Sequence, residues 1–188
     1  MQRTKKITAF VLAIALCVGM LPILGVNAKA ADTGKHMDVL FTHDTHSHLN
    51  SFPTIVDGKQ EEVGGFARLK TLIDEQKEKN PDTLYLDGGD FSMGTLIQTV
   101  YETEAAELRM LGYLGCDVTT WGNHEFDYGM PSFLELAGKL NCGYYSCNFI
   151  STASGQSVFA PYKMISYGDT QVAYVGVSTP ESFTKSTP

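Results

Sequence analysis

Strand-like and helix-like segments alternate along most of the chain, and this alternation limits the fold more than any other feature. Short apolar runs typical of buried strands are separated by longer segments in which apolar residues recur at helical spacing. The expected strands are residues 39–41, 84–86, 118–121 and 144–146, and the expected helices are residues 66–79, 101–111 and 133–140. Strands joined by helices of this length form βαβ units, so we predict an α/β fold with a mainly parallel sheet covered by helices.

The remaining segments are expected to be a hairpin and two loops. Residues 162–165 and 172–177 read as strands on either side of Tyr167-Gly168-Asp169-Thr170, which is typical of a hairpin turn. The polar segments 50–62 and 151–157 are expected to be loops. We find no internal repeat and no low-complexity tract in the sequence.

Polar residues gather directly after the first three expected strands. The three clusters are His43-Asp44-Thr45-His46-Ser47-His48, Gly88-Gly89-Asp90 and Gly122-Asn123-His124-Glu125-Phe126-Asp127. Because the carboxyl ends of parallel strands share one edge of a sheet, these clusters should converge. Oxygen and imidazole donors without thiolate suit divalent ions such as manganese, zinc, iron, calcium or magnesium. The pattern therefore predicts a metal site, with Asp90 as the natural bridge between two ions.

Each cluster also has a purely structural interpretation. Asp44 and Asp90 could cap helices or turns, and Asn123 could occupy a left-handed turn after Gly122. His43 and His48 are expected to be solvated loop residues without a ligand role. Three independent caps would rarely follow successive strands in this order, so the joint pattern favours the metal site.

The first thirty residues resemble an export signal. Basic residues at positions 3, 5 and 6 precede an apolar run over residues 7–26, and Ala28-Lys29-Ala30 has the small-x-small pattern that signal peptidase accepts. We predict cleavage after Ala30, with an uncleaved membrane anchor as the alternative, because the run approaches the roughly 20 residues that span a bilayer. The exported chain is expected to be extracellular, periplasmic or associated with the cell wall, without stable membrane insertion.

Charge and cysteine content restrict the partners. Four of the 14 basic residues lie in the signal segment, so residues 31–188 carry 10 basic and 21 acidic side chains. This acidic surface makes a nucleic-acid polymer an improbable partner. Three cysteines remain, Cys116, Cys142 and Cys147. We expect buried free thiols, with a Cys142–Cys147 disulfide as the alternative, and the cysteine spacing does not support a zinc site.

The motifs together resemble a known family. Asp44-Thr45-His46, Gly89-Asp90 and the hexapeptide Gly122–Asp127, in this order, are similar to the calcineurin-like metallophosphoesterase superfamily, and within it to exported 5′-nucleotidases and 2′,3′-cyclic-nucleotide phosphodiesterases. Gly64-Gly65-Phe66-Ala67-Arg68 resembles the glycine pair that opens this family's first helix. The resemblance covers nearly all of residues 37–180 and implies a layered α/β sandwich, incomplete at its C-terminus. It also implies hydrolysis of a nucleotide or another small phosphoester.

The resemblance implies a role for each motif residue. Asp44 and His46 would bind the first of two divalent metal ions, Asp90 would bridge both ions, and Asn123 would bind the second. His124 would lie beside the scissile phosphate as a catalytic residue, oriented by Asp127. Glu125 and Phe126 are expected to serve packing or supporting hydrogen bonds rather than catalysis.

The sequence also departs from the family pattern. His43 stands where the family usually has Asn, and Ser47 where it usually has Gly. The family completes its dinuclear site with later histidines, whereas this sequence has none after His124, and the usual nucleotide-binding domain is missing. We therefore expect residues 31–188 to be the N-terminal part of a catalytic domain. The alternatives are an exported metal-binding module that is not an enzyme, and a single-ion phosphoesterase completed by a partner chain.

Overall fold

A computed structural model describes residues 37–140, 142–167 and 170–186 of the chain. The expected signal segment, residues 1–30, lies outside the described residues, and so does the centre of the expected hairpin turn at residues 168–169. Within the described part, no helix is long and apolar enough to cross a membrane.

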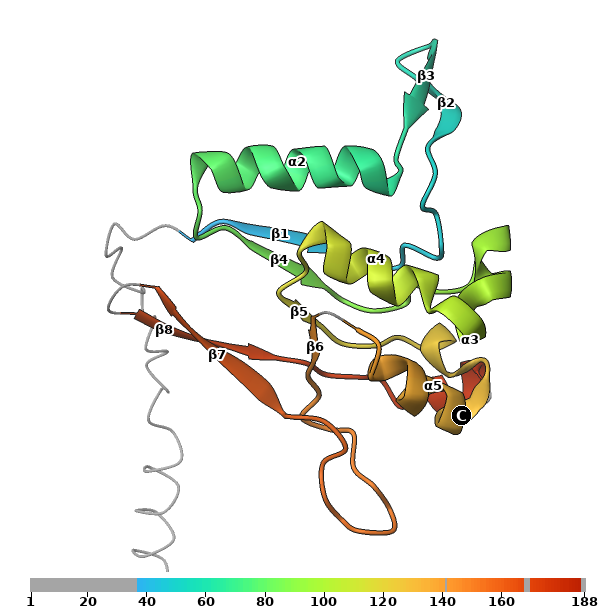
Figure 1. The fold of residues 1–188 in the computed structure, drawn as a ribbon, viewed down its shortest axis with the longest axis vertical. Coiled ribbons are helices and arrows are strands. Elements are labelled where there is room, and N and C mark those ends of the chain that lie inside the picture. The colour runs from blue at the N-terminus through green and yellow to red at the C-terminus, as the bar shows by residue number, and fades with distance from the viewer. Residues whose placement is uncertain (1–36, 141, 168–169, 187–188) are drawn as a thin grey trace, which may run out of the picture. The chain divides into compact units, whose positions relative to one another are not determined.

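A four-stranded parallel sheet forms the centre of the fold (Figure 1). Its strands are β1 (Val39–Thr42), β4 (Leu84–Asp87), β5 (Val118–Thr119) and β6 (Gly143–Tyr144), in the order β1-β4-β5-β6. The register pairs Val39 with Leu84, Leu86 with Val118, and Val118 with Gly143. The prediction of a parallel α/β sheet is confirmed, although β5 and β6 are shorter than expected.

Three helices supply the core on one face of this sheet. They are α2 (Phe66–Lys79), α4 (Ala106–Leu114) and α5 (Gly129–Ala137). Their apolar residues pack with Tyr85 of β4 and Tyr144 of β6 in one buried cluster, which includes Ile73, Leu108, Leu111, Phe133 and Leu136. The bounds of α2 agree with the prediction. Helix α5 begins four residues and ends three residues before the bounds expected at 133–140. Pro131 is tolerated in its first turn, because the amides there have no acceptor within the helix.

The single helix expected over residues 101–111 is wrong. The chain instead forms a 3₁₀ turn η1 (Leu96–Val100), a short helix α3 (Tyr101–Glu104), and then α4. Ala105 separates the two helices in a left-handed conformation with φ 49° and ψ 44°. Alanine adopts this conformation at a cost of roughly 1–2 kcal/mol, so apolar spacing alone could not reveal the break.

The loop expected over residues 50–62 is also wrong, because most of it is a β-hairpin. Strand β2 (Phe52–Val56) pairs antiparallel with β3 (Lys59–Val63), and the hairpin projects away from the parallel sheet in Figure 1. The two turn residues, Asp57 and Gly58, both have positive φ, at 50° and 76°. Two consecutive positive φ values match the type I′ turn that suits hairpins.

A second hairpin packs on the other face of the sheet. Strand β7 (Tyr162–Tyr167) pairs antiparallel with β8 (Thr170–Val175), as the sequence predicts. Tyr174 buries itself with Leu84 and Val118 in a smaller core cluster. This face is covered only in part, since Phe41 and Val177 are 60% and 64% exposed. A one-turn helix α6 (Ser182–Lys185) follows.

The three described cysteines are free thiols that differ in exposure. Cys116 is buried, Cys142 is half-buried and Cys147 is exposed. Burial is therefore confirmed for Cys116 and wrong for Cys147, because Cys147 follows the short strand β6 in a surface connection. Residues 151–157 form turns, as predicted.

Candidate metal centre

The loops that follow β1, β4 and β5 meet at one edge of the sheet. Three backbone hydrogen bonds join the first two loops: the amides of Asp44, His46 and Ser47 donate to the carbonyls of Gly89, Asp90 and Phe91, with N–O distances of 3.0, 3.2 and 2.8 Å. The third loop begins at Gly122 and continues into a 3₁₀ turn η2 (His124–Phe126). The predicted convergence of the polar clusters is present.

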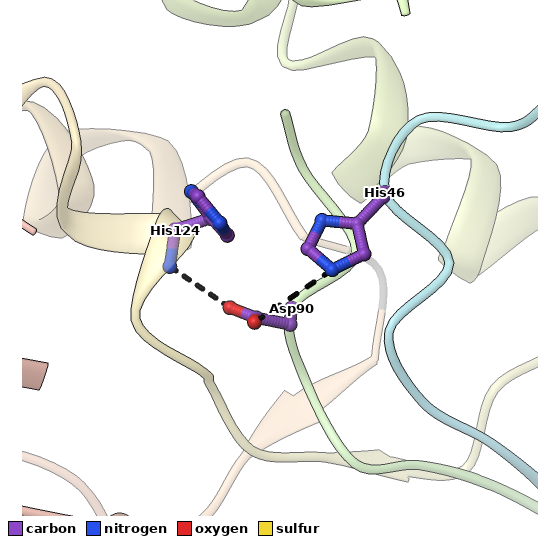
Figure 2. A group of neighbouring side chains, drawn as sticks. All are labelled: His46, Asp90 and His124. Carbon is purple, nitrogen blue, oxygen red and sulfur yellow. Dashed lines mark hydrogen bonds and ion pairs between the residues drawn. The ribbon is translucent and has the colours of Figure 1, made fainter. Parts of the chain in front are cut away.

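His46, Asp90 and His124 form the centre of this edge (Figure 2). One potential ligand atom from each lies within 4.8 Å of the others, a spacing that could hold a metal ion. The His46 Nε2 atom is 3.9 Å from Asp90 Oδ2, and the two imidazole rings meet edge to face with centroids 5.1 Å apart. The Asp90 carboxylate and the His46 imidazole suit zinc, manganese or iron, and His124 lies close enough to contact a group bound there. The residues present therefore fit a divalent cation.

The ring of His46 is held by the chain in an orientation that suits metal binding. Its Nδ1 atom lies 2.9 Å from the carbonyl oxygen of Met93. A carbonyl only accepts hydrogen bonds, so this contact places the proton on Nδ1 and leaves the Nε2 lone pair facing Asp90. The carbonyl comes from the loop after β4, where Met93 adopts φ 61°. Sequence reasoning did not identify this contact, because a backbone acceptor has no residue signature.

His124 and Asp127 form a close hydrogen-bonded pair. The His124 Nδ1 atom is 2.6 Å from Asp127 Oδ2, and both side chains are about one-third exposed or less. Burial opposes protonation of His124, but the hydrogen bond and charge of Asp127, with the charges of Asp90 and Glu125, raise the pKa of His124 above its usual value. Asp127 therefore favours the protonated imidazole and engages it through Nδ1 rather than Nε2.

Asp90 is held tightly by its surroundings. Its backbone has φ 55°, and its Oδ1 accepts a 2.8 Å hydrogen bond from the amide of His124. The glycines on either side permit this approach. A Cβ atom on Gly122 would lie 2.7 Å from the Asp90 Cβ, and one on Gly89 would lie 2.6 Å from the Trp121 Cα. Glycine at both positions is therefore a consequence of two loops in direct contact.

Glu125 is fully buried beneath the same loops. Its carboxylate accepts hydrogen bonds from the amides of Asp90, Phe91, Ser92 and Gly122, at 2.9, 3.0, 3.3 and 2.6 Å, and from the Ser92 hydroxyl at 3.1 Å. Burial raises the pKa of Glu125 to about 7; the Asp90 charge adds to this rise and the backbone donors oppose it. The sequence placed Glu125 in a supporting role, but it did not predict how many backbone groups converge on it.

Asp44 and Asn123, the other two expected ligands, are placed differently. Asp44 has φ 51°, and its carboxylate is 56% exposed and lies 3.1 Å from His43 Nδ1. It does not belong to the group formed by His46, Asp90 and His124. Asn123 is half-buried and directly precedes η2, where its carbonyl accepts the amide hydrogen of Phe126 at 3.1 Å. In the sequence, Asp44 lies two residues before His46 and Asn123 lies directly before His124.

Asn148, which the sequence left without a role, holds a neighbouring loop. Its Nδ2 donates to the Ser178 carbonyl at 2.6 Å, and its Oδ1 accepts the Ser178 amide hydrogen at 3.0 Å. The loop that precedes α6 is fixed by this pair of bonds. Helix α6 in turn contacts η2, which carries His124.

Comparisons with known proteins agree with this geometry. Residues 37–185 match the calcineurin-like phosphoesterase family. A 5′-nucleotidase of Bos taurus is 35% identical over 159 residues, which cover 78% of this chain and 27% of that protein. The human 5′-nucleotidase is 32% identical over 175 residues, or 87% of this chain and 30% of the relative. The chain thus spans less than a third of the length of these relatives.

Solved structures show the same fold. The Haemophilus influenzae NAD nucleotidase superposes with a TM-score of 0.72 and 27% identity, covering 81% of this chain and 28% of that one. A 5′-nucleotidase precursor from Thermus thermophilus gives a TM-score of 0.71 and 29% identity, covering 78% of this chain and 29% of that one. The family match extends over most of the chain and includes all three loops of the candidate metal centre. This chain therefore belongs to the calcineurin-like phosphoesterase family.

Proposed function

We propose that this chain carries the N-terminal part of the catalytic domain of an exported phosphoesterase, which hydrolyses phosphate esters of nucleotides with two divalent metal ions. The observation that carries the proposal is the convergence of His46, Asp90 and His124 within 4.8 Å at the strand ends. The curated relatives named 5′-nucleotidase support a nucleotide substrate. The acidic side-chain balance supports cations as the means of holding an anionic phosphate.

The metal-binding roles follow from the positions of the donors. His46 offers Nε2, because Nδ1 is engaged by the Met93 carbonyl, and Asp90 offers Oδ2, because Oδ1 is engaged by the His124 amide. Asp44 and Asn123 complete the proposed ligand set. Divalent ions at such a site lower the pKa of bound water and neutralise phosphate oxygens. The residues of the chain fix where that chemistry takes place.

His124 has the proposed catalytic role. Its Nδ1 is held at 2.6 Å by Asp127, which orients the ring and favours the protonated form. A protonated Nε2 can donate a hydrogen bond to a phosphate oxygen or deliver a proton to the leaving oxygen. Asp127 contributes by holding the imidazolium, as a neighbouring carboxylate does.

The rest of the ligand set is proposed to come from chain beyond this sequence. The sequence has no histidine after His124, and the curated relatives are more than three times as long. The partly covered sheet face beside Phe41 and Val177 supports a further layer of the domain. We propose residues 1–30 as a cleaved signal segment, residues 31–188 as the first part of the domain, and a nucleotide-binding domain further along.

The roles can be separated with two variants of the longest natural form. Asp90→Ala removes the bridging ligand, so we expect loss of both bound metal and hydrolysis of a nucleoside monophosphate. His124→Ala should keep the metal content while the turnover rate falls by roughly 10² to 10⁴. His48→Ala is the matched control, since His48 is exposed and outside the centre. Normal turnover of Asp90→Ala would refute the bridging role, and loss of metal from His124→Ala would make His124 a ligand.

The same experiment distinguishes the other candidate functions. A chain that binds metal but does not hydrolyse any phosphoester in its longest natural form would be a binding module. Turnover that rises with the square of protein concentration would indicate a site completed by a partner chain. The intact mass of the exported protein tests both the cleavage after Ala30 and the proposed length.

A further inference from the structure

We propose that Glu125 is a positioning residue of the metal centre: its buried carboxylate holds the loops after β4 and β5 together and thereby sets the position of Asp90. The inference rests on the proposed metal site and adds a residue to it that does not touch the ion. The alternative is that Glu125 stabilises the fold in general, like any well-paired buried group.

The hydrogen bonds of Glu125 are concentrated on one short segment. Three successive amides, those of Asp90, Phe91 and Ser92, and the Ser92 hydroxyl all donate to its carboxylate. The amide of Gly122 donates from the other loop at 2.6 Å. One side chain thus bonds to the backbone of the bridging ligand and to the loop that leads into Asn123 and His124.

The chemistry of these partners requires a carboxylate. All five partners are donors, and an ionised carboxylate accepts through both oxygens without offering a proton. A glutamine has the same size, but its NH₂ group would face backbone N–H donors. Those donors would then have no acceptor. A buried donor without a partner is costly. The successive amides, with Gly89 and Asp90 both at positive φ, form the kind of backbone concavity that binds anions.

The contact between the two loops is reciprocal, which links Glu125 to the ligand atom itself. The Asp90 carboxylate accepts the amide hydrogen of His124 at 2.8 Å, while the adjacent residue, Glu125, accepts the amide hydrogen of Asp90 at 2.9 Å. Displacing Glu125 should therefore disturb both contacts, the one made by the Asp90 amide and the one made by the Asp90 carboxylate. Metal ligands must be placed within about 0.2 Å of their ideal distances, so a small displacement of Asp90 affects ion binding more than it affects folding.

The test compares metal affinity with stability in the same variants of the longest natural form. Manganese affinity is measured by electron paramagnetic resonance titration, and the melting temperature by circular dichroism. We expect Glu125→Gln to weaken manganese binding by roughly 10- to 100-fold, the usual effect of losing a group that orients a ligand. Ser92→Ala removes only one of the five donors and should weaken it by a smaller factor.

Asp117→Asn is the matched control. The Asp117 carboxylate also joins neighbouring elements of the sheet, accepting the Tyr85 amide hydrogen at 2.9 Å beside Lys77, but it lies at the start of β5, opposite the metal edge. This variant should lower the melting temperature and leave manganese affinity within about twofold of wild type. If Glu125 only stabilised the fold in general, the loss of manganese affinity would follow the loss of melting temperature in the same ratio in Glu125→Gln, Ser92→Ala and Asp117→Asn. That result would overturn the positioning role.

The outcomes separate this inference from the proposed function. A longest natural form with the wild-type sequence that binds no manganese or zinc would refute the proposed metal site and this inference with it. Wild-type binding together with unchanged affinity in Glu125→Gln and Ser92→Ala would overturn only the role of Glu125. If Glu125→Gln does not fold, Ser92→Ala decides, because its small buried side chain can lose the hydroxyl without a change in packing volume.

Discussion

Gly122→Ala perturbs the metal centre without replacing any of the proposed ligand residues. The φ of Gly122 lies outside the left-handed region, and the obstacle that the structure shows for alanine is the space that its Cβ needs. The added Cβ would lie closest to the Asp90 Oδ1 and Cγ atoms and 2.7 Å from the Asp90 Cβ, whereas carbon atoms prefer about 3.5 Å or more. Asp90 and Gly122 must therefore separate by about 0.8 Å.

Two effects of different size follow from that displacement. Overpacking of this kind costs about 1–3 kcal/mol, which in a domain of this length lowers the melting temperature by roughly 2–12 °C. A ligand moved by about 0.8 Å exceeds the tolerance of about 0.2 Å for a metal bond, so manganese affinity should fall at least about tenfold. We expect a folded protein with a damaged centre.

The assay is manganese titration and thermal unfolding of the same preparation, with Gly138→Ala as the control. Gly138 has φ −68°, and its nearest obstacle is the Glu135 carbonyl at 3.3 Å, so its alanine variant should change stability by less than about 1 kcal/mol and affinity not at all. Gly122→Ala protein with wild-type manganese affinity would refute the close contact between these loops as a determinant of the site.

Three other predictions concern single side chains. Burial raises the pKa of Asp87 above its usual value. Its contribution to the free energy of unfolding is therefore complete below the unfolded pKa of about 3.9 and is lost as pH rises through the folded pKa. Urea unfolding measured across pH should show this loss of stability in the wild-type protein and not in Asp87→Asn. Asp127→Ala should lower turnover without changing bound metal, because it removes the acceptor that orients His124; equal loss of metal would contradict this. In the chain without residues 1–30, Cys147 should react with a thiol reagent well before Cys116, since only Cys147 is exposed, and mass spectrometry of the labelled peptides identifies the order.

The sequence predicted the sheet because apolar runs and strand order suffice for it. The four strands at residues 39–42, 84–87, 118–119 and 143–144 each carry apolar or aromatic residues, and helix α2 ends at the lysine–asparagine–proline run. Near-continuous apolar runs of this kind are typical of strands in parallel sheets. The convergence of the three polar clusters then follows from topology alone.

The parts that sequence reasoning missed depend on backbone conformation. The hairpin β2–β3 carries the Asp57-Gly58 pair that favours a type I′ turn. Its strands are mostly exposed, and a polar segment without regular apolar alternation predicts a loop rather than a strand. The break at Ala105 gave no signal, because alanine is the strongest helix former. Glu125 is expected to serve packing or supporting hydrogen bonds, but its partners could not be named, since they are mostly backbone amides, which nearly every residue has.

The position of Asp44 is compatible with the proposed ligand set when the energies are compared. Its carboxylate is engaged by His43 at 3.1 Å, and both side chains are more than half exposed. An ion pair exposed to this degree contributes at most about 1 kcal/mol, and it depends on protonation of His43. A divalent cation carries twice the charge of His43 and does not depend on protonation, so a cation held by His46 and Asp90 would compete with His43 for the Asp44 carboxylate, while the hydrogen bond from the Asp44 amide to Gly89 holds the backbone. His43, which stands where the family usually has asparagine, therefore competes for the Asp44 carboxylate without closing the site.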